Sequence, residues 1–125
     1  MRQIAILGII PLIALSSICF ALTGQELLRD CERAGQLGGS LETGRCVSYI
    51  DGVIDAKASA ALDYYSRTGK TAPPFCLPTS QLTFDQIRLI YSKFARDNPQ
   101  DLHLPADRLL IRSLANAFPC NPRSQ

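Results

Sequence analysis

The length, composition and charge of the chain are those of one small domain. It has 125 residues, of which 46% are hydrophobic, and a formal net charge of +2, so it can bury a modest core. It carries no basic run and no acidic tail, and the composition therefore gives no support for binding to nucleic acid or to a membrane surface.

The first 21 residues have the pattern of a secretory signal. Arg2 supplies a positive start, residues 4–18 are almost wholly apolar, and residues 19–21 offer small side chains where signal peptidase requires them. The apolar run is too short for a comfortable membrane span. We therefore expect cleavage after residue 21, export, and a mature domain over residues 22–125. A lipoprotein attached through Cys19 and an uncleaved anchor are the alternatives.

The mature domain keeps an even number of cysteines. An even count in an exported chain of this length indicates two disulfides. With 12 basic and 11 acidic residues after the signal, the mature domain is nearly neutral. The cysteines concerned are Cys31, Cys46, Cys76 and Cys120.

The first predicted helix begins after Thr23. Thr23 and Glu26 have the spacing of a capping box, and Leu22 and Leu27 that of a hydrophobic staple. Gly35 is expected to end this helix. Its inner face is expected to consist of Leu27, Leu28 and Cys31.

A second helix, over residues 46–66, is predicted to be the element around which the chain is built. It follows a glycine-rich connector over residues 36–45. Its apolar residues recur at both helical spacings, in a stripe so wide that we expect other elements to pack on more than one side of it. Gly52 is expected to allow close approach of another helix, and Asp51 and Asp55 to mark a polar edge.

Two further helices are predicted after an irregular, proline-containing stretch over residues 67–82. Thr83 and Gln86 form a second capping box, and Asn98-Pro99 ends the third helix. The connector that we call the crossing, residues 96–104, leads to Pro105 at the first position of the fourth helix. The inner faces are expected to hold Ile87, Ile90, Tyr91 and Phe94, then Leu110, Leu114, Ala117 and Phe118.

These elements predict an all-α fold, a small bundle of about four helices stapled by two disulfides. Cys31 lies near the end of the first helix and Cys46 at the start of the second, positions that oppose each other in a helical hairpin. Cys76 precedes the third helix and Cys120 follows the fourth. We therefore favour the pairs Cys31–Cys46 and Cys76–Cys120, while the two other pairings stay open.

The residues give little support to catalysis. His103 is the only histidine. The cysteines are expected to form disulfides, which leaves them unable to bind a metal, and they also lack the C-x-x-C spacing of many zinc sites. Asp51 and Asp55 could be paired carboxylates, but an exposed helix edge is the commoner meaning. We predict that the protein is not an enzyme and has neither a metal nor another cofactor.

Several separated motifs resemble the Rap/Tai family of immunity proteins. They are Cys46-x-x-Tyr49-x-x-Gly52, Phe75-Cys76-x-Pro78, Asn98-Pro99-x-x-x-His103-x-Pro105-Ala106 and Ala117-Phe118-Pro119-Cys120. The resemblance covers nearly the whole mature chain.

The resemblance implies a function and a partner. Members of the family are small helical periplasmic proteins, commonly dimers, that bind peptidoglycan amidases secreted by type VI systems and block their active-site clefts. It thus implies a homodimer in the periplasm with a secreted amidase as its partner. A small periplasmic chaperone or stress protein is the alternative.

An inhibitory surface can be suggested from the order of the helices. The crossing is short and lies between two well-defined helices, so little ordering entropy would be lost on binding. The hypothesis assigns the partner contact to Asn98, Gln100, Asp101 and His103 there. On a dimer, part of the third helix of the other subunit could contribute, with Arg88, Lys93 or Ser92 outward. Residues 67–82 are the second candidate, and an ordinary connector is the plain interpretation.

Overall fold

The structure, a computed structural model, describes residues 21–78 and 82–120. The predicted signal over residues 1–21 lies almost wholly outside the described residues. The helices are α1 (Gly24–Arg33), α2 (Ser40–Thr68), α3 (Phe84–Asp97), the short 3-10 helix η1 (Pro99–Asp101) and α4 (Ala106–Ala117). In the described part no strand forms, and one isolated bridge joins Thr23 to Pro105. The all-α prediction is confirmed.

Helix α1 is the centre of the bundle. It packs against α2, α3 and α4, and α3 packs against α4. Its predicted capping box forms: Thr23 Oγ1 accepts from the Glu26 N–H at 3.3 Å, and the Thr23 N–H donates to Glu26 Oε2 at 2.8 Å. Its inner face is buried at Leu27, Leu28 and Cys31. The prediction that residues 46–66 are central is therefore wrong.

Helix α2 begins at Ser40, six residues earlier than predicted. A Cβ on Gly39 would lie 2.3 Å from the Arg33 carbonyl oxygen, so this glycine lets the chain fold tightly back onto the end of α1. The α2 side of the hairpin is then held to α1 by an ion pair between Arg45 Nε and the buried Asp30 carboxylate at 3.1 Å. The expected connector over residues 36–45 is thus only a turn, and its second half is helical.

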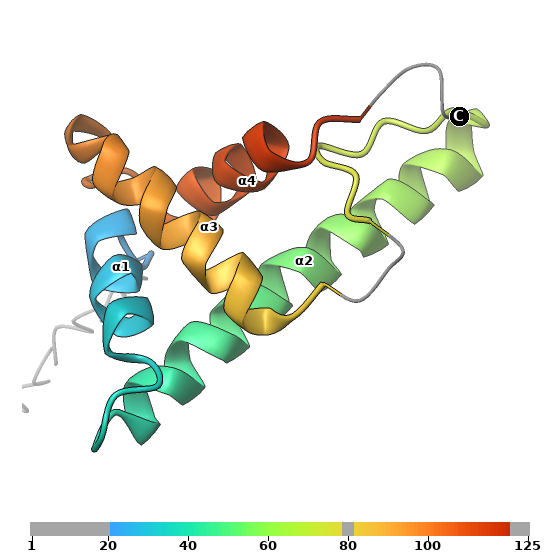
Figure 1. The fold of residues 1–125 in the computed structure, drawn as a ribbon. Helices are drawn as coiled ribbons and strands as arrows, with labels where there is room; N and C mark the ends of the chain where they lie inside the picture. Colours follow the sequence, from blue (N-terminus) through green and yellow to red (C-terminus); the bar gives the residue numbers. More distant parts are fainter. Residues whose placement is uncertain (1–20, 79–81, 121–125) are drawn as a thin grey trace, which may run out of the picture.

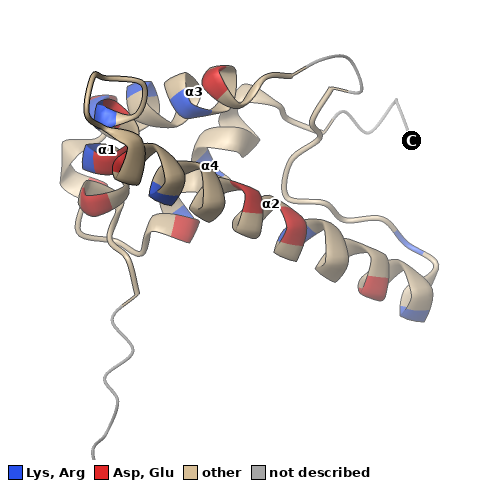
Figure 2. Ribbon diagram, turned by 90° about the horizontal axis from the view of Figure 1, so that it is seen from below, with Lys and Arg blue, Asp and Glu red and all other residues tan. Residues whose placement is uncertain are grey.

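The outer half of α2 is not covered by other helices. Within α2 only Cys46 and Ile50 are buried, and the outer half, residues 55–68, which we call the arm, extends away from the bundle (Figure 1, Figure 2). A Cβ on Gly52 would meet no atom within 4 Å, so no helix approaches closely there. The arm thus lacks the helix packing that the wide stripe predicted, and the expectation of close approach at Gly52 is wrong.

Helices α3 and α4 complete the core. The second capping box forms, with Thr83 accepting from the Gln86 N–H. Pro105 is the residue before α4 rather than its first residue, Ala117 is exposed rather than inward, and Ser92 is buried rather than outward. The largest fully buried side chains of these two helices are Tyr91, Leu109, Leu110 and Leu114.

Both favoured disulfides are present. Cys31 joins Cys46 between α1 and α2, and Cys76 joins Cys120 beyond the ends of α2 and α4. The first is buried in the core, whereas Cys76 of the second is exposed. The second pair ties the chain that leaves α2 to the chain that leaves α4.

Candidate functional site

The crossing is held in place by its backbone. The carbonyl oxygens of Leu104 and Leu102 accept from the N–H groups of Gly24 and Gln25 at 2.8 and 3.0 Å, and the Ala106 N–H donates to the Leu22 carbonyl at 2.7 Å. The first turn of a helix has N–H groups without partners inside the helix. The crossing satisfies two of these in α1, so it forms an ordered ledge across the start of that helix.

The predicted site residues on the crossing divide into two kinds. Asn98 donates to the Phe94 carbonyl at 2.8 Å, and Asp101 accepts from Arg112 Nη1 at 2.8 Å. These two side chains hold the connector in shape. Gln100 and His103 are exposed, and Gln100 has only a 3.4 Å hydrogen bond to Asn98, so these two are available to a partner.

Within one chain, the α3 residues that were predicted to contribute from a second subunit do not lie together at the crossing. The Arg88 side chain is 17% exposed and donates to Asp85 and to the Cys31 carbonyl, each at 3.0 Å. It lies ten residues before Asn98, about 15 Å along the helix axis. Lys93 is exposed and forms an ion pair with Asp97 at 2.7 Å, near the crossing. Of the two cations, only Lys93 could add to a surface there.

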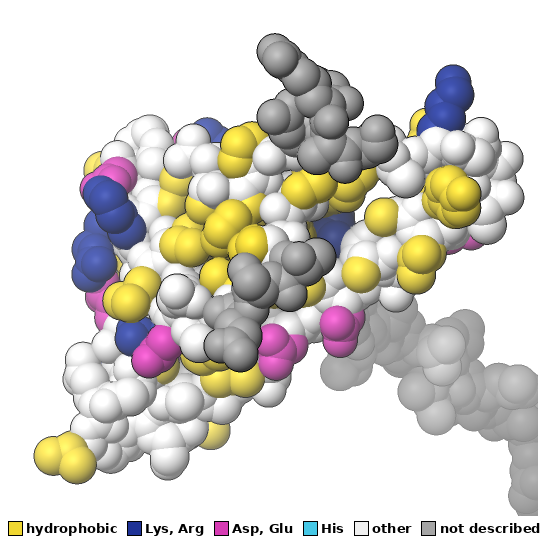
Figure 3. All heavy atoms as spheres, turned by 45° about the vertical axis from the view of Figure 1, so that its right-hand side comes forward, with side chains coloured by type: hydrophobic (Ala, Val, Ile, Leu, Met, Phe, Trp, Pro, Cys, Tyr) yellow, Lys and Arg dark blue, Asp and Glu magenta, His cyan; other side chains and the backbone are white. Residues whose placement is uncertain are grey.

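An apolar surface on the arm was not predicted as a site. Leu62 is 70% exposed and Tyr65 is 54% exposed. Together with residues 71–73 they border an open groove of about 610 Å³, and Figure 3 shows separate hydrophobic side chains exposed along the arm, at the right of the view. We call this surface the arm face; it consists of Ala58, Ala61, Leu62, Tyr65, Ala72 and Pro73. The breadth of the apolar stripe in the sequence was its signal, and it was wrongly attributed to packing within the chain.

Acidic residues lie on α2 before the arm face and basic residues lie at its far end. Asp51 and Asp55 precede it on α2, while Arg67 and Lys70 follow it. Figure 2 shows acidic segments spaced along α2 and a basic one at its far end. Because Arg67 is ion-paired with Asp63, Lys70 is the one of these two cations that is better placed to meet an acidic group on another molecule.

The segment after α2, residues 69–78, is a strap that returns from the tip of the arm to the bundle. Gly69 has a left-handed backbone, with φ of +66°, which ends the helix and reverses the chain. Phe75 is buried in the core. The Cys76 N–H donates to the Phe118 carbonyl at 2.9 Å. One strap residue thus anchors in the core and the next is tied to the end of α4.

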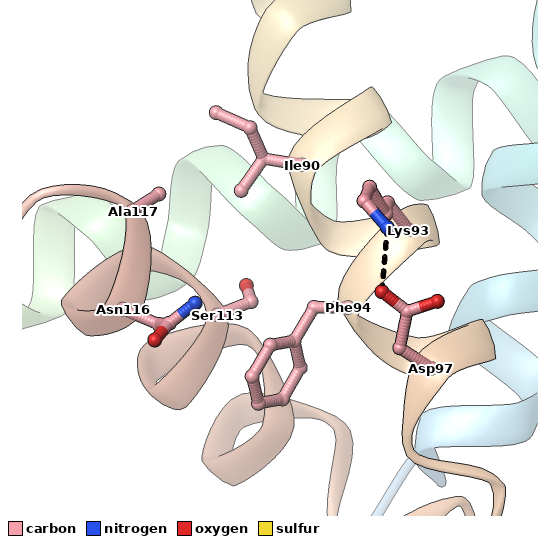
Figure 4. A pocket seen from close by; sticks show the side chains of 7 residues that line it. All are labelled: Ile90, Lys93, Phe94, Asp97, Ser113, Asn116 and Ala117. Atoms are coloured by element: carbon pink, nitrogen blue, oxygen red, sulfur yellow. Dashed lines mark hydrogen bonds and ion pairs between the residues drawn. The ribbon is translucent and has the colours of Figure 1, made fainter.

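A small notch lies between α3 and α4. It measures about 190 Å³, and Figure 4 shows the Lys93–Asp97 ion pair at its edge with Phe94 beside it. Arg112 lies over the Phe94 ring, 5.9 Å from its centroid. The notch borders the crossing and could accept a side chain of a partner.

The described residues contain no arrangement suited to a metal ion. No group of three or more histidine, cysteine, aspartate or glutamate side chains lies close enough together in residues 21–78 and 82–120. His103 is exposed, and Cys31, Cys46, Cys76 and Cys120 are in disulfides. In the same residues no helix is long and apolar enough to cross a bilayer. What the arrangement offers is a polar ledge and an apolar face, both suited to binding proteins.

Comparison with known proteins gives one match. A family model described as Rap1a immunity proteins matches residues 23–120. No curated protein and no solved structure matches the chain. The matched residues include all the helices and both disulfides.

Proposed function

Because the chain belongs to the Rap1a immunity protein family, we propose that it is a periplasmic immunity protein that binds a type VI secreted peptidoglycan amidase and blocks its active-site cleft. The family match over residues 23–120 is the observation that carries this proposal. The pattern of a signal over residues 1–21 supports the location. An inhibitor of this kind needs a rigid polar projection, and the crossing provides one.

The proposal assigns the amidase contact to Gln100 and His103. Both are exposed, and both side chains can hydrogen-bond polar groups in a hydrolase cleft. Asn98 and Asp101 act indirectly by shaping the ledge, and Lys93 extends its polar edge. Arg88 acts only by joining α3 to α1.

The test is the double substitution Gln100→Ala/His103→Ala, assayed with a confirmed cognate amidase. We expect calorimetry to show an affinity for the amidase at least tenfold lower, which is a loss of about 1.4 kcal/mol or more of binding free energy. The melting temperature of the variant should be unchanged. Gln36→Ala, on an exposed residue of the α1–α2 turn, is the matched control. Full binding and inhibition by the double variant would place the inhibitory surface elsewhere.

We also propose that the arm face binds a second copy of the chain. A twofold interface uses the same surface on both molecules. If two arms pair in opposite directions about Ala61, the small Ala58 and Ala61 of one arm can receive the large Leu62 of the other. The same arrangement brings Asp51, which lies just before each arm on α2, towards Lys70 of the other copy.

Sedimentation equilibrium tests this homodimer. We expect Leu62→Glu to give a monomer with an unchanged melting temperature, because the side chain is 70% exposed in the single chain. Leu89→Glu, at a 52% exposed leucine on α3, is the matched control and should remain a dimer. A parent protein that stays monomeric at all concentrations, or a dimeric Leu62→Glu variant, contradicts this assignment.

The exposed arm face also favours one alternative, a periplasmic chaperone that holds unfolded clients on apolar surface. Exposed apolar patches serve many kinds of protein contact. A client-aggregation assay separates the two functions: an immunity protein leaves the aggregation of a denatured model protein unchanged, whereas a chaperone suppresses it.

A further inference from the structure

The two disulfides differ in their access to solvent. Cys31 and Cys46 are both 0% exposed, whereas Cys76 is exposed and Cys120 is half-buried. Reduction requires a thiolate to reach a sulfur atom of the disulfide. In the folded protein, a reductant can therefore attack Cys76–Cys120 while Cys31–Cys46 stays protected.

The exposed disulfide lies where the strap meets the bundle. Cys76 follows the buried Phe75, and Cys120 Sγ lies 3.7 Å from the Pro73 carbonyl oxygen. The strap contributes Ala72 and Pro73 to the arm face, and on its other side Phe75 and Leu77 border a smaller groove against Ile54 and Ala58 of α2. The strap thus supplies two of the six residues of the arm face and is also the neighbour against which the arm packs.

The rest of the fold does not depend on this disulfide for its main contacts. Helix α1 holds α2, α3 and α4 together, and Cys31–Cys46 closes the hairpin from within the core. The arm has no comparable helix partner among the described residues. Loss of the Cys76–Cys120 link should therefore loosen the strap and the arm more than the bundle.

We propose that the Cys76–Cys120 disulfide is a redox switch. In the oxidised chain it holds the strap against the arm, so that the arm face is ordered, and in the reduced chain the strap and the arm loosen and the arm face loses its fixed shape. The effect of this switch on dimer formation rests on the homodimer proposed above. A chain in which only this disulfide has been reduced would keep its core, closed by Cys31–Cys46, but would not present a fixed surface to a second copy.

The chemistry is ordinary thiol–disulfide exchange. One thiolate of a dithiol reductant attacks a sulfur of the pair and forms a mixed disulfide, and its second thiolate then displaces the remaining cysteine. Two electrons and two protons pass to Cys76 and Cys120, which become thiols, while the reductant becomes a cyclic disulfide. The reverse reaction needs a disulfide oxidant, such as oxidised glutathione or a disulfide-donating protein, which accepts two electrons.

The first experiment measures which disulfide is reduced. The folded protein is treated with limiting dithiothreitol, quenched with iodoacetamide at intervals and analysed by peptide mass. We expect alkylation of Cys76 and Cys120 to be about tenfold or more faster than that of Cys31 and Cys46, because access governs the rate. Equal rates would overturn the proposal.

The second experiment measures what reduction releases. Hydrogen exchange is compared between the oxidised protein, the selectively reduced and alkylated protein, and the Cys76→Ser/Cys120→Ser variant. We expect exchange in residues 55–68 to become about tenfold or more faster while residues 24–33 keep their protection, because local opening exposes amides only in the released segment. Unchanged exchange in the arm, or unfolding of the whole chain in both reduced forms, would overturn the proposal.

The same samples in sedimentation equilibrium connect the switch to pairing. We expect the oxidised protein to be a dimer, both opened forms to be monomers, and reoxidation of the reduced, unalkylated protein to restore the dimer. An oxidised protein that is monomeric would refute the homodimer, yet the exchange data would still decide the switch. Opened forms that remain dimers would refute the switch and leave the homodimer intact.

Discussion

Tyr91 shows how one buried side chain connects two helices that are far apart in the sequence. It is fully buried, and its hydroxyl donates to the Gly24 carbonyl oxygen at 2.8 Å, joining α3 to the first turn of α1. Burial raises the pKa of Tyr91, with a smaller contribution from Tyr49. Burial also raises the pKa of Tyr49, and the negative charge of the nearby Asp107 carboxylate raises it further. Both phenols are therefore held in the neutral form.

The raised pKa values predict a loss of stability in alkali. Unfolded tyrosine ionises near pH 10, so the unfolded chain loses these protons first and the free energy of unfolding falls as the pH rises from there through the folded pKa values. We expect urea melts to show stability that is constant between about pH 7 and pH 9 and decreases above about pH 10.

Tyr91→Phe should remove part of this pH dependence. At neutral pH it should also lower the free energy of unfolding by about 1 kcal/mol, the usual contribution of a hydrogen bond. Tyr64→Phe, on the exposed arm, is the control. Stability that changes equally with pH in the Tyr91→Phe variant and the parent would refute this account of Tyr91.

At the scale of the elements, two glycines in helices behave in opposite ways. Gly52 lies inside α2 with nothing within 4 Å of a Cβ, whereas a Cβ on Gly24 would lie 2.7 Å from Leu109 Cδ2. Gly52 therefore lowers the stability of α2 through its low helix propensity and has no packing role there. The buried one is the point where α1 packs against α4.

We therefore expect Gly52→Ala to stabilise the protein by up to about 1 kcal/mol, the difference in helix propensity. Gly24→Ala should destabilise it by about 1–3 kcal/mol, the usual effect of overpacking. Chemical denaturation of both variants beside the parent measures this. Destabilisation by Gly52→Ala would show that α2 has a close neighbour after all.

At the scale of the whole molecule, the described cysteines are all used. Each of the four forms a disulfide, in the pairs Cys31–Cys46 and Cys76–Cys120. If the signal is cleaved after Ala21, Cys19 is removed with it. The exported protein then contains no free thiol.

Intact-mass analysis of protein purified from the periplasm checks this prediction. We expect a mass that begins at residue 22, and no increase after alkylation under non-reducing denaturing conditions. After full reduction, four alkyl groups should be added. Retention of residues 1–21, or alkylation without reduction, would contradict it.

The sequence by itself determined the local features of the fold. Both capping boxes, the end of α3 at Asn98-Pro99 and the inner faces at Leu27, Tyr91 and Leu110 follow from interactions between neighbours in the chain. The disulfide pairs were found because the order of the helices limits which cysteines can meet. The family could be recognised because its motifs are local residue patterns.

Only the tertiary structure decided what each face contacts. Periodicity shows that α2 has an apolar stripe, but Ile50 is buried and Leu62 is exposed on the same helix, because α1 is too short to cover both. Nor does the sequence show that Asp101 is engaged by Arg112 while His103 is exposed. A residue pattern fixes the direction of a side chain along its own helix, whereas the neighbour that it meets depends on how distant parts of the chain pack.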